Sequence, residues 1–207
     1  SSSEAPCWLT GAKFNIVDSC FQASDNLIAI IAQQENKNII TTTYGELKTL
    51  TNRVANGISD AGFIPGDTIA ICMQMTTECV AIYLGIIKAG CVAVSIADSY
   101  APDAIALRLN IANCVGVFTQ DYILRDDKKL PSYDKIVTAD GPKTIVISSE
   151  NSKGIKLRDG DSEWAEFLSD KLQFQFIFSF YWPVISGTIL SPFFTPYFLD
   201  TLGSRLF

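Results

Sequence analysis

The feature that most constrains the fold is an alternation of apolar, strand-length runs with helical segments across residues 43–119. Three runs, at 68–73, 91–96 and 115–119, are predominantly apolar rather than apolar at every second residue. Such runs are typical of strands that are buried on both faces of a parallel sheet. The alternation therefore predicts an α/β fold, a layered parallel sheet with helices on both faces and right-handed crossovers.

The helix after residue 43 is the most strongly indicated element. Thr43 and Glu46 have the spacing of a capping box, in which each residue bonds the backbone N–H of the other. Apolar residues recur behind it at helical spacing, and Gly62 supplies a left-handed stop. A second helix at 76–89 ends at Gly90 in the same way. Further expected elements are a short buried strand at 27–32, a helix at 102–113, and apolar runs at 135–137 and 144–148.

The absence of histidine narrows the chemistry that the chain alone could perform. Neither a Ser-His-Asp triad nor a Cys-His nucleophile can be assembled, and zinc sites with histidine ligands are excluded. The net charge of −6, from 22 acidic and 16 basic residues, comes without a basic stripe. Because nucleic acid phosphates require clustered Lys and Arg, we expect no nucleic acid partner.

The six cysteines indicate a reducing compartment. None forms a C-x-x-C pair, and no apolar signal-peptide core occurs near the start of the chain. We therefore expect an intracellular protein, cytoplasmic or in another reducing compartment. Four of the cysteines lie within apolar runs, where cysteine commonly behaves as a small buried hydrophobe: Cys72, Cys79, Cys91 and Cys114.

The composition changes near residue 171 and divides the chain into two parts. Residues 1–170 have the composition of a globular domain, whereas 171–207 form a tail that holds 11 of the 23 aromatic residues. No charged residue occurs in 172–199. We expect the tail to lie outside the domain and to be unstructured or aberrant.

Three interpretations of this tail stay open. Its 28 consecutive uncharged residues exceed the ~20 that cross a bilayer, although Pro183, Pro192 and Pro196 interrupt them. Phenylalanine alternates with other residues over 173–180, which is the period of a strand and an aggregation hazard. The composition also matches what thymine-rich codons encode, as in a translated intron or a shifted frame. We favour this last interpretation, followed by the membrane segment.

One acidic segment has the appearance of a calcium loop. Asp159, Asp161 and Glu163 alternate, but the sixth position of such a loop requires glycine and here holds Trp164. A turn and cap before a short helix at 164–168 explains these residues better. We therefore assign no metal ligand.

Glycine-rich phosphate-binding loops are absent from the sequence. Neither G-x-x-x-x-G-K-[ST] nor G-x-G-x-x-G occurs. Ser186-Gly187-Thr188 has the composition of such a loop, but the glycine and lysine that should follow are missing. We assign no catalytic residue, and the residues that would bind a cofactor are unassigned.

An ordered series of motifs over 43–119 resembles the N-terminal region of the adenylate-forming (AMP-forming) acyl-CoA synthetases. The series is Thr43-Tyr44-Gly45-Glu46-Leu47, Asn52-Arg53-Val54-Ala55-Asn56-Gly57, Gly62, Pro65-Gly66-Asp67-Thr68-Ile69-Ala70-Ile71, Glu78 with Ala81, and Lys88-Ala89-Gly90. Three further segments look like the plant peroxisomal acyl-activating enzymes: 94–100, 118–121 and 157–164. The resemblance covers about residues 8–170 and implies part of the large N-terminal domain of that fold.

The resemblance implies a two-step ligation that uses ATP, magnesium and CoA. A carboxylate attacks the α-phosphate of ATP to give an acyl-adenylate and pyrophosphate, and the CoA thiol then displaces AMP. The family's Ser/Thr/Gly-rich phosphate loop should begin soon after 164–168, where this chain enters its tail. We therefore expect a truncated, inactive carboxylate–CoA ligase that binds no cofactor by itself. The alternative is a non-catalytic binding module, or a regulatory fragment tethered to a membrane through 172–199.

Peroxisomal members of this family often end in a Ser-Lys-Leu-type tripeptide, which is read only as the last three residues. Here Phe207 follows Ser204-Arg205-Leu206. We therefore expect that the tripeptide is not presented, and peroxisomal residence rests on the resemblance alone.

Overall fold

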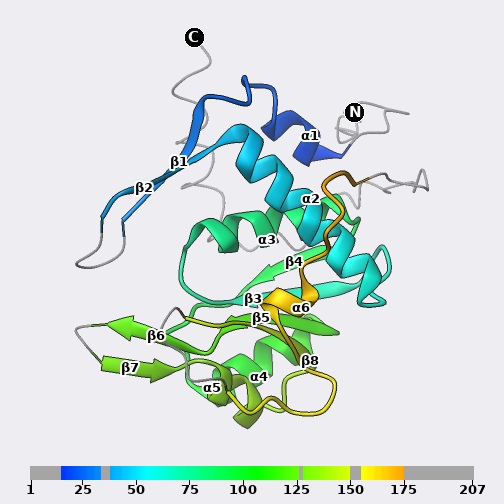
Figure 1. The fold of residues 1–207 in the computed structure, drawn as a ribbon. Coiled ribbons are helices and arrows are strands. Elements are labelled where there is room, and N and C mark those ends of the chain that lie inside the picture. The colour runs from blue at the N-terminus through cyan, green and yellow to red at the C-terminus, as the bar shows by residue number, and fades with distance from the viewer. Residues whose placement is uncertain (1–14, 34–37, 126–127, 150–154, 175–207) are drawn as a thin grey trace, which may run out of the picture. The chain divides into compact units, whose positions relative to one another are not determined.

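The computed structural model describes residues 15–33, 38–125, 128–149 and 155–174. Its centre is a parallel sheet with the strand order β4-β3-β5-β8-β9 (Figure 1). β3 lies between β4 and β5, with Ile69 opposite both Ala93 and Gly116. The strands are β3 (Thr68–Cys72), β4 (Val92–Ser95), β5 (Gly116–Gln120), β8 (Lys143–Ile147) and β9 (Ser162–Glu163).

Helices cover both faces of this sheet, as the sequence predicts. One apolar cluster joins the sheet to α2 (Tyr44–Asp60), α3 (Thr77–Lys88) and α6 (Trp164–Phe167), and it also contains Val17 of the short helix α1 (Ile16–Cys20). A second cluster joins the opposite face to α4 (Pro102–Ile111) and α5 (Tyr133–Thr138). Fully buried residues of the two clusters include Val54, Ile58, Ile82, Phe118, Ile105, Val117 and Ile136.

Helix α2 begins with the capping box that the sequence predicts. The backbone N–H of Thr43 donates to Glu46 Oε2 over 2.8 Å, and the backbone N–H of Glu46 donates to Thr43 Oγ1 over 3.3 Å. The backbone N–H and the hydroxyl of Thr43 both donate to the Glu46 carboxylate, which stabilises its ionised form and holds the pKa of Glu46 below its usual value. After Ala61, Gly62 takes the left-handed conformation at φ 90°. The helix prediction is confirmed at both ends.

The cysteine prediction is also confirmed where the structure describes the side chains. Cys72, Cys79 and Cys91 are buried and Cys114 is half-buried, and all four are free thiols. Burial disfavours the thiolate and raises the pKa of Cys91 to about 12 and that of the other three to about 11.

The expected strand at 27–32 exists, but its predicted burial is wrong. Among the described residues β1 (Ile28–Ala32) pairs with β2 (Ile40–Thr43) alone, as an antiparallel ribbon that projects from the helices in Figure 1. Ile28, Ile31 and Ile40 are 55%, 69% and 58% exposed. Ala29 and Ile30 are half-buried against the apolar cluster described above, so the strand is only partly covered. An apolar run alone does not show how much of a strand is covered.

Three local elements differ from, or add to, the sequence prediction. A short helix, α1 (Ile16–Cys20), precedes β1, and Asn15 caps it by accepting from Val17 N. A second antiparallel ribbon joins β6 (Tyr122–Arg125) to β7 (Lys128–Pro131). The apolar run at 135–137 belongs to helix α5. The buried residues of this helix are Tyr133 and Ile136, which are three positions apart and therefore lie on one helical face.

The uncharged tail lies almost wholly outside the described residues, including the fragment Ser186–Thr188. Within the described ranges, no helix is long and apolar enough to cross a membrane. The interpretations of 175–207 given above therefore stay predictions.

Candidate functional site

The carboxyl edge of the parallel sheet is the place where the topology favours a ligand. From β3 the chain passes to β4 on one side, and from β5 it passes to β8 on the other. Neighbouring strands whose connections leave in opposite directions define a switch point, outside which open α/β sheets bind their ligands. The loops at this edge follow residues 72, 95, 120 and 147.

Side chains and main chain tie the loops together at the β3–β5 switch point. Gln120 Oε1 accepts from the backbone N–H of Gln74 over 3.0 Å. Thr119, which is fully buried, donates its hydroxyl to the carbonyl of Cys72 over 2.8 Å. Met75 stands 78% exposed beside them. The edge is thus a fixed polar rim with an apolar side chain at its margin.

Asp121 fixes the next part of the rim. Asp121 is only 5% exposed, and both of its carboxylate oxygens accept hydrogen bonds. Oδ1 accepts from Tyr122 N over 2.7 Å and from the Ser149 hydroxyl over 2.6 Å, and Oδ2 accepts from Ser149 N over 3.1 Å. A carboxylate with this many donors is committed to holding the loops after β5 and β8 together, and it is not free to act as a base.

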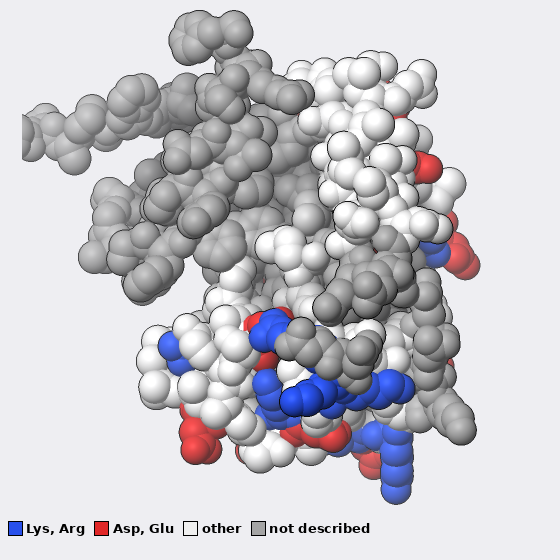
Figure 2. Space-filling model, turned by 90° about the vertical axis from the view of Figure 1, so that its left-hand side faces the viewer, with Lys and Arg blue, Asp and Glu red and all other residues white. Residues whose placement is uncertain are grey.

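Basic side chains gather next to this rim, on the β6–β7 ribbon and on α5. Figure 2 shows Lys and Arg side chains grouped on the face that the ribbon presents. Arg125 pairs with Asp98 at 3.4 Å, and Lys135 Nζ donates to the carbonyl of Asp98 over 2.9 Å. Lys128 and Lys129 are exposed, and Lys129 Nζ lies 4.4 Å from the ring centre of Tyr122. We call Arg125, Lys128, Lys129 and Lys135 the basic patch. Such a group attracts anions.

The acidic segment near residue 160 forms a hydrogen-bonded turn. The Asp161 side chain is 2% exposed, and its carboxylate accepts from Tyr133 Oη over 2.7 Å, Arg158 Nε over 2.9 Å and Thr144 N over 2.8 Å. Burial and the bond to Asp161 raise the pKa of Tyr133, and the bond to Asp161 raises that of Arg158. Asp161 thereby ties α5, β8 and the turn before α6 together. Within the described ranges no group of three or more Cys, Asp or Glu could hold a metal ion.

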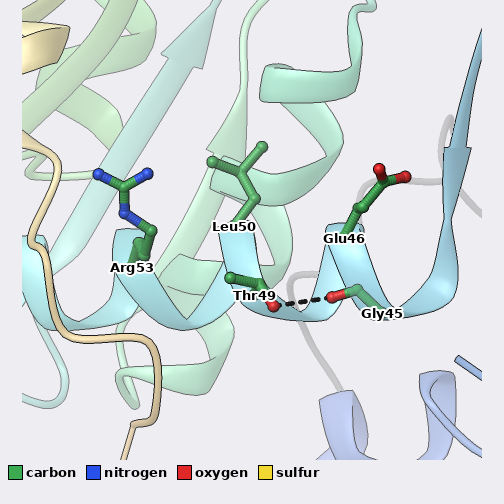
Figure 3. Close-up of a pocket in the computed structure, with 5 residues that line it drawn as sticks. All are labelled: Gly45, Glu46, Thr49, Leu50 and Arg53. Carbon is green, nitrogen blue, oxygen red and sulfur yellow. Dashed lines mark hydrogen bonds between the residues drawn. The ribbon is translucent and has the colours of Figure 1, made fainter.

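A shallow hollow of about 340 Å³ opens on α2, lined by Gly45, Glu46, Thr49, Leu50 and Arg53 (Figure 3). Thr49 donates its hydroxyl to the Gly45 carbonyl over 2.8 Å, and Glu46 is committed to the capping box. Figure 3 shows Leu50 and Arg53 projecting on the side of the helix where Glu46 also lies. The hollow therefore offers no paired nucleophile and base.

Sequence reasoning assigned no residue to the carboxyl edge, although the signal was present. Gln120, Asp121 and Ser149 are polar residues at or just beyond the ends of apolar runs, where parallel strands deliver side chains to one edge. The fragment Ser186–Thr188 is not among the described residues.

Comparisons with known proteins agree on one family. The family model described as "AMP-binding enzyme" matches residues 19–173. The chain is 42% identical over 173 residues to the probable peroxisomal acyl-activating enzyme 18 of Arabidopsis thaliana and 35% identical over 176 residues to the hexanoyl-CoA synthase of Cannabis sativa. These alignments cover 79% and 81% of this chain but 24% of each relative. The chain thus spans about a quarter of the length of these curated relatives.

Solved structures show the same fold at lower sequence identity. Acetoacetyl-CoA synthetase from Streptomyces lividans superposes with a TM-score of 0.72 and 18% identity over 82% of this chain and 27% of that one. An acyl-CoA synthetase from Brucella canis gives 0.66 and 22%, over 78% and 29%. The α/β sheet with its helices is the fold of the corresponding part of these proteins.

Proposed function

The chain belongs to the AMP-binding enzyme family, and from this premise we propose that it is the N-terminal part of an ATP-dependent carboxylate–CoA ligase. The observation that carries the proposal is the family match over 19–173, together with relatives that are named as CoA synthases or synthetases. The substrates of the complete ligase are then a small carboxylate, ATP with magnesium, and CoA.

The proposed reaction proceeds in two displacements. A carboxylate oxygen bonds to the α-phosphorus of ATP and pyrophosphate leaves, which gives the acyl-adenylate. The CoA sulfur then bonds to the acyl carbon, the thiol proton is lost and AMP leaves. The part of the ligase present here contributes the sheet and its carboxyl edge. Hydrogen bonds of Asp121 and Gln120 hold the loops at that edge in place, so these two side chains have a structural role.

We propose that these 207 residues alone do not catalyse the ligation. Nothing in the sequence provides the Ser/Thr/Gly-rich loop with lysine that would hold a triphosphate. Histidine is absent, and Asp121 and Asp161 are bonded to neighbouring groups. The test is release of pyrophosphate by the purified chain with ATP, magnesium, CoA and short- or medium-chain acids. Turnover above that of a heat-denatured sample would refute the proposal of inactivity.

A second candidate function is a non-catalytic module that binds a phosphate-bearing molecule at the carboxyl edge. The basic patch favours it, because Lys128 and Lys129 are exposed on the ribbon that leaves the edge where this topology places ligands. Calorimetry with AMP, ATP and CoA tests it. Saturable binding that weakens in a Lys128→Gln/Lys129→Gln variant supports the module, and no binding at millimolar ligand rejects it.

We propose peroxisomal residence for the complete ligase, because two relatives are named as peroxisomal enzymes. Imaging an N-terminally tagged full-length transcript product beside a peroxisomal marker tests this. Carbonate extraction tests the membrane-tethered alternative through 172–199, since recovery only in the soluble fraction rules out a span.

A further inference from the structure

The segment 168–174, which leads away from α6, lies against one side of helix α2. We call it the exit segment. It meets α2 at Asn52, Arg53 and Asn56, and Gly57 contacts Phe167, the residue just before it. The spacing of these residues, i, i+1, i+4 and i+5, places them on one side of the helix. We call these four residues the α2 stripe.

The hydrogen bonds between the stripe and the exit segment share one chemical feature. Each donor is a side-chain N–H of α2, and each acceptor is a main-chain carbonyl of the exit segment. They are Asn52 Nδ2 to Leu172 O (3.0 Å), Arg53 Nε to Ser169 O (2.8 Å), and Asn56 Nδ2 to Lys171 O (3.0 Å) and Gln173 O (3.1 Å).

Gly57 lets the chain approach the helix closely just before these contacts. A Cβ at this position would lie 2.5 Å from the carbonyl oxygen of Phe167 and 2.9 Å from its ring. Phe167 is 7% exposed and packs edge-on against Phe118 at 5.2 Å between ring centres. The core thus anchors the start of the exit segment, and the stripe holds the residues that follow.

Leu168 and Phe174, at the two ends of the exit segment, pack against the apolar cluster of α2, α3 and α6. The side chains between them take little part in the contact with α2. Lys171 and Asp60 form an ion pair at 2.9 Å with side chains 65% and 50% exposed. Asp170 lies 3.6 Å from Arg53 and is fully exposed. Exposed pairs of this kind contribute little. Between Leu168 and Phe174 the buried contacts are those to the main chain, since Asn52 and Asn56 are each 8% exposed.

The side-chain oxygen of Asn52 indicates that the α2 stripe is suited to binding main chain. Asn52 Oδ1 is buried and has no hydrogen-bond partner among the described residues. A buried acceptor without a donor is costly, so such atoms usually have a partner in the complete molecule. A side-chain amide that pairs with an extended chain uses its N–H for a carbonyl and its oxygen for a main-chain N–H. Asn52 shows the first half of that pairing.

We propose that the α2 stripe is a binding site for extended main chain, which fixes the path of residues 169–173 irrespective of the side chains that they carry. The polypeptide beyond residue 173 then starts from a fixed point and direction. The value of this fixed starting point to the ligase rests on the proposed function, in which the phosphate loop follows soon after the exit segment. Asn52 and Asn56 are accordingly positioning residues for whatever follows.

Trypsin cleavage of the full 207-residue chain after Lys171 tests the proposal, because the stripe holds the carbonyl at the scissile bond. Asn56→Asp keeps the size of the side chain but replaces its donor by an acceptor, and Asn56→Ala removes it. Loss of two hydrogen bonds predicts cleavage about tenfold faster or more in either variant. Cleavage after Arg108, within α4, reports global unfolding in the same digest.

Two sets of matched variants separate main-chain from side-chain recognition. Leu172→Ser and Gln173→Ala change the exit segment, and Asp60→Asn removes the exposed ion pair. All three should cleave after Lys171 within about twofold of the wild-type rate. Asn52→Asp is a second stripe variant, should Asn56→Asp not fold.

Equal acceleration after Lys171 and Arg108 in the stripe variants would overturn the proposal, as would acceleration by Gln173→Ala that matches Asn56→Ala. An unchanged rate in folded Asn56→Asp and Asn52→Asp would do the same. Because the digest contains no nucleotide, a negative result in the ligase or calorimetry assays leaves this outcome untouched. The two proposals therefore fail separately.

Discussion

Replacing Asp161 by alanine should be among the most damaging single changes in the described part of the chain. The Asp161 side chain is only 2% exposed, and its carboxylate accepts hydrogen bonds from Tyr133 Oη, Arg158 Nε and Thr144 N at 2.7–2.9 Å. Hydrogen bonds that involve a charged group contribute about 1.5–3 kcal/mol each, and a donor left without a partner adds its own cost. The Arg158 side chain is 31% exposed, so water partly compensates its loss.

From these contacts we expect Asp161→Ala to lower the free energy of unfolding by about 3 kcal/mol. Asp161→Asn keeps an acceptor oxygen and should cost about half as much. Loss of about 3 kcal/mol is a large fraction of the 5–15 kcal/mol typical of a domain. Urea unfolding followed by circular dichroism measures both losses of unfolding free energy, provided that the dependence on urea concentration (the m-value) is the same in wild type and variants.

The matched control is Asp159→Ala, since Asp159 is an exposed carboxylate in the same turn. It should change the unfolding free energy by less than about 0.5 kcal/mol. If Asp161→Ala proves no more costly than Asp159→Ala, the hydrogen-bonded tie between α5, β8 and the turn before α6 does not stabilise the fold.

Three further outcomes follow from the packing and the ionisable groups. Gly85→Ala would place a Cβ 2.5 Å from Val54 Cγ1, so we expect a loss of about 1–3 kcal/mol in urea unfolding that Val54→Ala partly restores. Burial raises the pKa of Cys72 to about 11 and that of Cys91 to about 12, so both thiols should resist iodoacetamide at pH 8 until urea unfolds the chain; rapid native labelling would contradict their burial. The pKa of Glu46 is lowered by hydrogen bonds from Thr43, so the stability that Glu46 contributes is complete above the normal glutamate pKa and is lost as pH falls through the lowered value. Glu46→Gln should therefore reduce the fall in melting temperature at acid pH, and the same fall in wild type and variant would argue against the capping box.

Local chemistry explains which elements the sequence could predict. Helix α2 has a cap, an apolar stripe and a glycine stop, and each lies within a few residues of the feature it specifies. Strands β3 and β5 were predictable because burial on both faces leaves a continuous apolar run. The strand predicted at 91–96 also exists, but its predicted burial on both faces is wrong, because β4 lies at the edge of the sheet and is only partly buried. The predicted second helix, 76–89, differs by one residue at each end from α3, Thr77–Lys88.

The remaining features depend on residues far apart in the sequence. Nothing near Asn56 indicates that its amide binds Lys171 and Gln173, which lie 115 and 117 residues away. The exposure of Ile31 likewise depends on what packs beside the ribbon rather than on its neighbours in sequence. Asp161 looked like a capping or turn residue, and only the fold brings Tyr133 to it. Tertiary contacts of this kind are absent from periodicity and spacing.

The β1–β2 ribbon has a practical consequence for anyone who purifies this chain. Two strands standing alone are barely stable in water, and their outer backbone groups can accept another strand. With Ile28, Ile31 and Ile40 turned to solvent, raising the protein concentration should drive copies together through this ribbon. Light scattering should therefore rise steeply with concentration, and a charged residue in place of Ile31 should delay that rise while leaving the melting temperature of the sheet unchanged.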